Sequence, residues 1–73
     1  METLPQKFGV VVRRRREAAG LSQEHLAHRA GLHRTYISLL ERGLRAPSIV
    51  VVRKVADGLG TTMTSLMRSL EQE

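Results

Sequence analysis

Four glycines divide this chain into five segments, each long enough for only one short helix. Gly20, Gly31, Gly43 and Gly60 each follow a run in which apolar residues recur at intervals of three and four, the spacing of one helix face. Glycine is typical of the position after a helix, because it adopts positive φ without strain. The spacing predicts an all-α fold in one domain, residues 1–73, with helices at approximately 4–19, 23–30, 34–42, 49–59 and 63–71.

Capping residues at the segment starts support helices, although two β-branched runs argue for strands. Thr3, Ser22 and Thr62 each stand where a helix N-cap is expected. The runs 10–12 and 49–52 favour strands by local propensity, but each lies inside a capped segment with helical spacing, so we predict helices there. The residues expected to face inward are Leu4, Phe8, Val11, Val12, Arg15, Ala19, Leu26, Ala27, Ala30, Tyr36, Ile37, Leu40, Leu44, Ile49, Val52, Val55, Ala56, Leu59, Met63, Leu66, Met67 and Leu70.

The spacing of small and apolar residues in the middle of the chain predicts two helices joined by a tight turn. Ala27 is small enough for close helix approach, and Gly31, four residues later, suits a turn that needs positive φ. Ile37 and Leu40 follow at the interval that locks the third helix against the first two. Together they predict a helix-turn-helix formed by the second and third helices.

The basic residues are concentrated in the first part of the chain. The formal net charge is +5, and residues 1–45 carry nine basic and four acidic side chains, whereas residues 46–73 carry three of each. Ten of the twelve bases are arginine, which suits bidentate contacts to phosphates and guanine edges. Phe8 and Tyr36 are the only aromatics, too few for a binder that stacks single-stranded bases on aromatic rings. A double-stranded polyanion is the expected partner.

Six short motifs lie between residues 20 and 48 of the chain. They are Gly20-Leu21-Ser22-Gln23-Glu24, Leu26-Ala27, Ala30-Gly31-Leu32, Arg34-Thr35-Tyr36-Ile37-Ser38, Glu41-Arg42-Gly43 and Pro47-Ser48. These motifs resemble those of the Cro/phage-repressor (Xre) family of DNA-binding domains. The resemblance extends from Phe8 to about Leu66 and implies a five-helix bundle of the lambda-repressor-like type, whose third helix enters the major groove. The run 34–38, together with the short length, also resembles the controller proteins of restriction–modification systems.

The outward face of the third helix supplies the candidates for base contact. A recognition helix contacts bases mainly from its N-terminal turns. Arg34 suits guanine O6 and N7, although an arginine at a helix start can also be simply solvated. Leu39 is apolar on a polar face, which suits either a thymine methyl or an incidental surface position. The candidate base-contacting residues are Arg34, Thr35, Ser38 and Leu39.

Other residues are candidates for phosphate contacts, which fix the register of a protein on DNA without selecting a sequence. The resemblance implies this role for Gln23, at the start of the second helix, and for Arg45, in the loop after the third. Tyr36 and Arg42 are further candidates, each with a purely structural alternative. The candidate phosphate-contacting residues are Gln23, Tyr36, Arg42 and Arg45.

Residues 13–16 form a run of four arginines, but a helix points them in four directions at ~100° per residue. Arg15 falls on the apolar face, where its stem can pack while its head reaches water. The resemblance implies that Arg16 pairs with Glu41 and orients the recognition helix.

The last two helices carry more apolar residues than a small bundle easily buries. Some can be core and others scattered on the surface. A homodimer through these helices is the alternative that we favour, because the zero net charge of residues 46–73 suits a protein-facing surface better than a DNA-facing one. Such a dimer would place two recognition helices about 34 Å apart on successive major grooves. The candidate interface residues are Val50, Val51, Met63, Met67 and Leu70.

Several classes of function are not expected from this sequence. Cysteine is absent, and His25 and His28 are three residues apart without a clear third ligand, so no metal or other cofactor is expected. No paired carboxylates, nucleophile–base pair or phosphate-binding glycine loop indicates an enzyme or a small-molecule site. The apolar runs are too short to span a membrane, so we expect a cytoplasmic protein.

The sequence predicts a transcriptional regulator that binds a (pseudo)palindromic operator in double-stranded DNA as a homodimer. One alternative is an antitoxin-like module whose main partner is a toxin protein. Another is a basic protein that binds nucleic acid or anionic membranes without specificity.

Overall fold

Five helices joined by short turns account for the secondary structure of the chain. The computed structural model describes residues 1–73 and contains α1 (Leu4–Ala18), α2 (Gln23–Ala30), α3 (Arg34–Glu41), α4 (Ile49–Gly58) and α5 (Met63–Glu71). The predicted all-α class is confirmed, and both β-branched runs lie in helices. Three helices end one residue earlier than predicted, because Ala19, Arg42 and Leu59 are C-caps. None of the helices has the length and apolarity that a membrane span requires.

Local capping explains why the helices begin where they do. The hydroxyls of Thr3, Ser22, Ser48 and Thr62 each accept a hydrogen bond from the backbone N–H three residues later. At the start of α1 the bond is reciprocated, since the backbone N–H of Thr3 donates to the Gln6 side chain at 2.8 Å. His33 occupies the N-cap of α3 but makes no side-chain capping bond.

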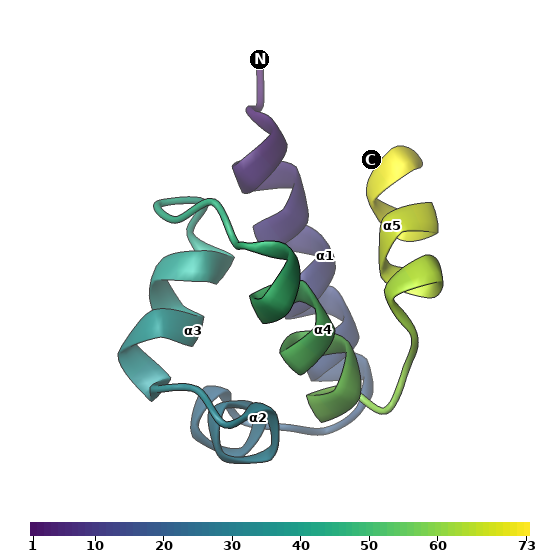
Figure 1. Ribbon diagram of the computed structural model, residues 1–73. Coiled ribbons are helices and arrows are strands. Elements are labelled where there is room, and N and C mark those ends of the chain that lie inside the picture. Colours follow the sequence, from purple (N-terminus) through teal and green to yellow (C-terminus); the bar gives the residue numbers. More distant parts are fainter.

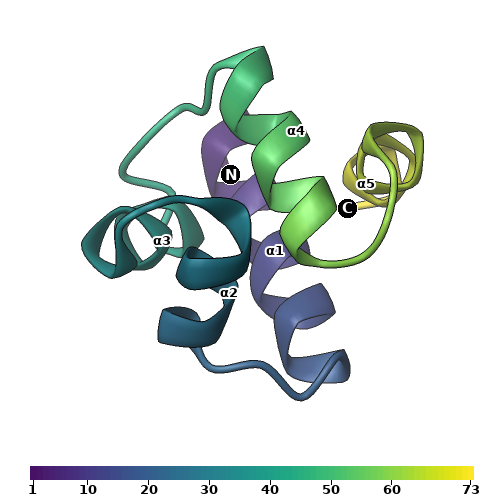
Figure 2. The same ribbon diagram turned by 60° about the horizontal axis from the view of Figure 1, so that its bottom comes forward.

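The helices are arranged around α1 and α4, with α3 on one side and α5 on the other (Figure 1, Figure 2). α2 packs against α3 and α4, and α3 also packs against α1. The substantial contacts of α5 are with α1 and α4 alone. The two termini lie at the same end of the molecule (Figure 1). The side of the bundle that carries α2 and α3 is therefore separate from the side that carries α5.

All five helices contribute to one apolar core. Four residues expected to face inward are instead exposed: Leu4, Ala19, Leu44 and Ile49. Leu4, Ala19 and Ile49 lie at or just beyond helix ends and Leu44 in a loop, where the periodicity continues but no neighbouring helix covers the side chain. The core consists of Phe8, Val11, Val12, Leu26, Ala27, Ile37, Leu40, Val52, Val55, Ala56 and Leu66.

Gly9 allows α1 to approach the end of α3 more closely than any residue with a side chain would permit. A Cβ atom at Gly9 would lie 2.5 Å from the carbonyl oxygens of Leu40 and Glu41. These are backbone atoms, so they cannot move aside as a side chain can. The position of α3 against α1 therefore depends on the absence of a side chain at residue 9.

We expect Gly9→Ala to reduce the free energy of unfolding by about 2 kcal/mol, because the steric cost outweighs the higher helix propensity of alanine. Urea unfolding followed by circular dichroism measures the change. Gly58→Ala is the comparison on another helix: its Cβ would lie 3.1 Å from the Cβ of Ala30 and from Cδ1 of Leu26 and 3.2 Å from the backbone nitrogen of Ala30, a milder overlap than at Gly9, so we expect a smaller loss. A Gly9→Ala variant as stable as the wild type contradicts the prediction.

Candidate nucleic-acid interface

The turn between α2 and α3 has the geometry that the sequence predicted. Gly31 ends α2 with φ 67° and ψ 34°, in the left-handed region that glycine adopts without strain. Ala27 is buried, as are Ile37 and Leu40 of α3. The backbone N–H of Leu32 donates to the carbonyl of Ala27 at 2.9 Å, which closes the turn. α2 and α3 thus form a helix-turn-helix whose second helix is held by its apolar face.

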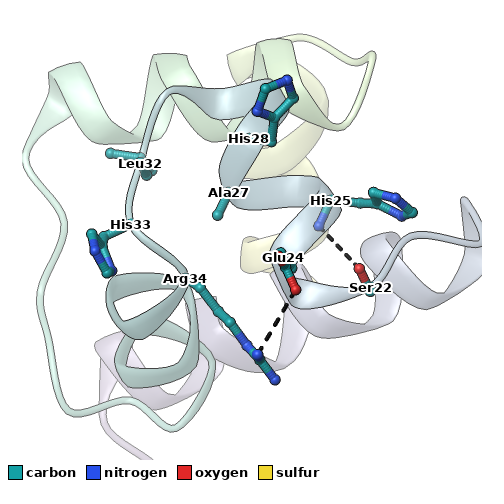
Figure 3. A pocket seen from close by; sticks show the side chains of 8 residues that line it. All are labelled: Ser22, Glu24, His25, Ala27, His28, Leu32, His33 and Arg34. Atoms are coloured by element: carbon teal, nitrogen blue, oxygen red, sulfur yellow. Dashed lines mark hydrogen bonds and ion pairs between the residues drawn. The ribbon is translucent and has the colours of Figure 1, made fainter.

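The starts of α2 and α3 lie beside each other on the surface. Arg34, the first residue of α3, extends toward Glu24 in the first turn of α2, with Nη1 3.8 Å from Oε2 (Figure 3). Both side chains are largely exposed, so this is a weak ion pair that solvent and salt screen. The two residues line an open hollow of about 660 Å³, together with Ser22, His25, Ala27, His28, Leu32 and His33. Arg34 is therefore free to leave Glu24 for another anionic or hydrogen-bonding partner.

The other candidate base-contacting residues lie on the same helix. Thr35 is exposed, and Ser38 and Leu39 are half-buried. At ~100° per residue, Thr35, Ser38 and Leu39 all fall away from the direction of the buried Ile37. α3 therefore presents arginine, hydroxyl and apolar groups on its outward side, beginning at its N-terminus.

A buried ion pair connects α1 to the end of α3. Nε of Arg16 donates to Oε2 of Glu41 at 2.7 Å and Nη2 donates to Oε1 at 3.1 Å, with side-chain exposures of 12% and 3%. Nη1 of Arg16 also donates to the carbonyl of Leu21 at 2.8 Å. The hydrogen bond to Glu41 raises the pKa of Arg16, and desolvation of the guanidinium opposes this. The structure thus contains the pair that the family resemblance implied.

Gln23 belongs to the same network. Its Nε2 donates to Oε1 of Glu41 at 3.1 Å, so the start of α2 is joined to the end of α3. The resemblance implied a phosphate contact for Gln23, and the structure adds this internal contact, which the sequence analysis did not anticipate. Its spacing of 18 residues from Glu41 carries no local signal that could have indicated it.

The remaining candidate phosphate contacts lie around α3. Tyr36 is half-buried, so part of its side chain packs against the bundle. Arg42 is exposed at the C-cap of α3, where its Nε donates to the carbonyl of Ser38 at 3.4 Å. Arg45 is exposed in the loop that follows.

Glu24 is a further residue of this surface, which the sequence-based prediction did not include. Its place in the first turn of α2 puts its carboxylate close to Arg34 at the start of α3.

The candidate interface residues on α4 and α5 differ in exposure. Val50 is 60% exposed, whereas Val51, Met63, Met67 and Leu70 are partly buried against the core. Met67 and Leu70 line a largely apolar hollow of about 210 Å³ between the first turns of α1, the loop before α4 and α5. Its other lining residues are Leu4, Pro5, Phe8, Ala46, Pro47 and Val52.

Among the described residues, no group of three or more His, Cys, Asp or Glu side chains is placed to hold a metal ion. His25, His28 and His33 all line the hollow beside Arg34, but their rings do not converge on one point (Figure 3).

Comparison with known proteins decides the family. A model of the helix-turn-helix family matches residues 12–66. The control protein C.MunI from Mycoplasma sp is 38% identical to this chain over 74 aligned residues, and the alignment covers both proteins completely. The chain belongs to the helix-turn-helix family of DNA-binding transcriptional regulators. Its relatives include the control protein C.BamHI of Bacillus amyloliquefaciens, which is 43% identical over 82% of this chain and 75% of that protein.

Solved structures place the chain among regulators of the controller type. The restriction–modification controller protein C.AhdI from Aeromonas hydrophila matches with a TM-score of 0.82 and 44% identity, covering 85% of this chain and 94% of that one. The wild-type restriction–modification controller protein C.Esp1396I matches with a TM-score of 0.90 and 30% identity, covering 99% and 95%. The predicted family and five-helix fold are both confirmed.

We expect Glu41→Gln to reduce the free energy of unfolding by about 3 kcal/mol, because it leaves the buried charge of Arg16 without a carboxylate. Thermal and urea unfolding of the two proteins measure the loss. Glu17→Gln removes a carboxylate from the exposed pair with Arg13 and is the matched control, with a change within about 0.5 kcal/mol. Equal losses in the two variants would show that the buried pair has no special role.

Proposed function

We propose that this controller-type regulator binds a palindromic operator as a homodimer and regulates genes of a restriction–modification system. The observation that carries the proposal is the outward face of α3, which begins with Arg34 beside the start of α2 and is held in place by the buried Arg16–Glu41 pair. A helix presented in this way fits the major groove of B-DNA. The names of C.AhdI and C.Esp1396I as restriction–modification controllers support the choice of genes.

Arg34, Thr35, Ser38 and Leu39 are the proposed base-contacting residues. Arg34 donates two hydrogen bonds to O6 and N7 of a guanine after it leaves Glu24. Leu39 contacts a thymine methyl, which is the favourable partner for an apolar side chain in the groove. The hydroxyls of Thr35 and Ser38 bond to base edges or to the adjacent phosphates.

Gln23, Tyr36, Arg42 and Arg45 are the proposed phosphate-contacting residues. Gln23 uses Nε2 for Glu41, and its backbone N–H at the start of α2 remains available for a phosphate oxygen. Arg45 is exposed beyond α3, where a guanidinium can bind a phosphate in a bidentate manner. These contacts set the register of α3 on the duplex.

The proposed dimer forms through Val50, Val51, Met63, Met67 and Leu70. Val50 is exposed on α4, and Met67 and Leu70 of α5 line the apolar hollow together with Val52 of α4. A second copy, packed about a two-fold axis, covers this surface on both protomers at once. The axis also relates the two recognition helices, so the operator is a palindrome with half-sites about one helical turn apart.

This function requires no cofactor, no catalytic residue and no small-molecule ligand, and it places the protein in the cytoplasm with its DNA. The similarity to control proteins supports a regulator and does not support the antitoxin-like alternative.

Selection from a random duplex library at near-physiological salt tests the proposal. We expect the selection to enrich a palindromic duplex that the protein binds at least ~10³-fold more tightly than a scrambled duplex. Equal, salt-sensitive binding to both duplexes would instead indicate a non-specific basic protein.

Arg34→Ala should lower affinity for the selected operator by about 1–3 kcal/mol and relax preference at one base pair in each half-site. Arg45→Ala should weaken all duplexes alike and reduce the dependence of binding on salt. Arg53→Ala is the control, because Arg53 is an exposed arginine on α4 paired with Asp57. Unchanged base preference in Arg34→Ala would remove Arg34 from the base-contacting set.

A further inference from the structure

The guanidinium of Arg15 on α1 is surrounded by oxygen atoms from α5 and the loop before it. Its Nη2 donates to Oγ of Ser65 at 2.7 Å, to Oγ of Ser69 at 2.8 Å and to the carbonyl of Ser65 at 3.3 Å. Its Nη1 donates to Oγ1 of Thr61 at 3.4 Å. We call Arg15, Thr61, Ser65 and Ser69 the Arg15 cluster. These bonds join residues that are far apart in the sequence and reach two serines about one turn apart on α5.

The chemistry of the cluster suits arginine. No carboxylate lies within ion-pair distance of Arg15, so its charge is met by neutral hydroxyls and one carbonyl. Three of the four bonds start from Nη2 and the fourth from Nη1. A lysine ammonium carries its three donors on one atom, so it lacks the second nitrogen that bonds Thr61. The cluster thus differs from the Arg16–Glu41 pair, although the two arginines are adjacent.

Few contacts hold α5 in one position. Leu66 is its only fully buried residue, its substantial contacts are limited to α1 and α4, and Met63, Met67 and Leu70 are only partly buried against the core. Beyond its end, Nη1 of Arg14 on α1 lies 2.8 Å from Oε2 of Glu73. A helix of nine residues is not stable by itself in water, so its position depends on tertiary contacts. The Arg14–Glu73 pair lies beyond the end of α5, whereas the Arg15 cluster bonds Ser65 and Ser69 within the helix. The cluster is therefore the polar contact within α5 that fixes its rotation on α1.

The residues proposed for the dimer lie on another face of the same helix. Met63 and Met67 are each two residues from Ser65, which places them about 200° around the helix from it. We infer that Arg15 is a positioning residue for self-association: by holding Ser65 and Ser69 against α1, it sets the direction in which α5 presents Met63 and Met67. This inference rests on the proposed homodimer.

Arg15→Met, which keeps an unbranched apolar stem, tests the hold on α5. Amide hydrogen exchange of the full chain should show faster exchange in α5 and unchanged protection in the core of α1 to α4. Arg13→Met is the control, because Arg13 is exposed on the same helix and its replacement by methionine removes the same charge. Unchanged exchange in α5 would overturn the inference without bearing on whether the protein dimerises.

Sedimentation equilibrium tests the effect on self-association. We expect Arg15→Met to raise the dimer dissociation constant by roughly tenfold or more, the size of effect that loss of charge-assisted hydrogen bonds produces. Affinity for a single half-site, where no dimer contact contributes, should stay within about twofold, since only the position of α5 changes. A general loss of stability would weaken both self-association and half-site binding, which separates positioning from a merely structural role. A monomeric wild type would overturn the dimer itself.

A double-mutant cycle links the effect to the cluster. Ser65→Ala with Ser69→Ala should raise the dissociation constant nearly as much as Arg15→Met, and combining all three changes should add little more. Thr64→Ala, an exposed hydroxyl of α5 outside the cluster, should have no effect. If Arg15→Met fails to fold, Arg15→Lys and the serine variants still carry the test. Full additivity of the changes would show that Arg15 does not act through these hydroxyls.

Discussion

The buried ion pair between Arg16 and Glu41 is the interaction on which the position of the recognition helix depends. Removing two charges from water is costly, and such a pair is tolerated only when further hydrogen bonds satisfy its remaining groups. Here the carbonyl of Leu21 and the amide of Gln23 provide them. One network therefore joins the end of α1, the turn after it, the start of α2 and the end of α3.

α1 is the common support for the two surfaces that the proposed function needs. Arg16 reaches toward α3, and Arg15, the next residue back, reaches toward α5. Gly9, nearer the start of the helix, allows close contact with the last carbonyls of α3. Since α3 and α5 lie on opposite sides of the bundle (Figure 2), their relative placement is set through α1.

Most of the fold could be predicted from the sequence, because the signals for helix ends are local. Caps such as Ser22 and glycines such as Gly31 act within a few residues, and no helix end was misplaced by more than one residue. The apolar periodicity could not show which helix ends extend beyond their neighbouring helices, so Ile49, the first residue of α4, was wrongly expected to be buried. The importance of Gly9 could not be seen, because its reason is the backbone of a distant helix.

The candidate site was predictable to a similar degree. The resemblance identified the Arg16–Glu41 pair, but the Arg15 cluster was missed, because the guanidinium of Arg15 was wrongly expected to reach water. The hydroxyls of Ser65 and Ser69, spaced by four, were a visible pattern that could have been matched to it. Whether Arg34 and its neighbours contact bases stays a prediction.

Because Arg15 and Arg16 are adjacent, one insertion or deletion in α1 would displace both of them. Substitutions on the solvent side of α1 leave both arginines in place, but insertion or deletion of one residue between Gly9 and Arg15 turns both by ~100° relative to Gly9. Both guanidinium groups would then point away from their oxygen partners at the same time. The length of this stretch of α1, more than the identity of its exposed residues, is therefore under constraint.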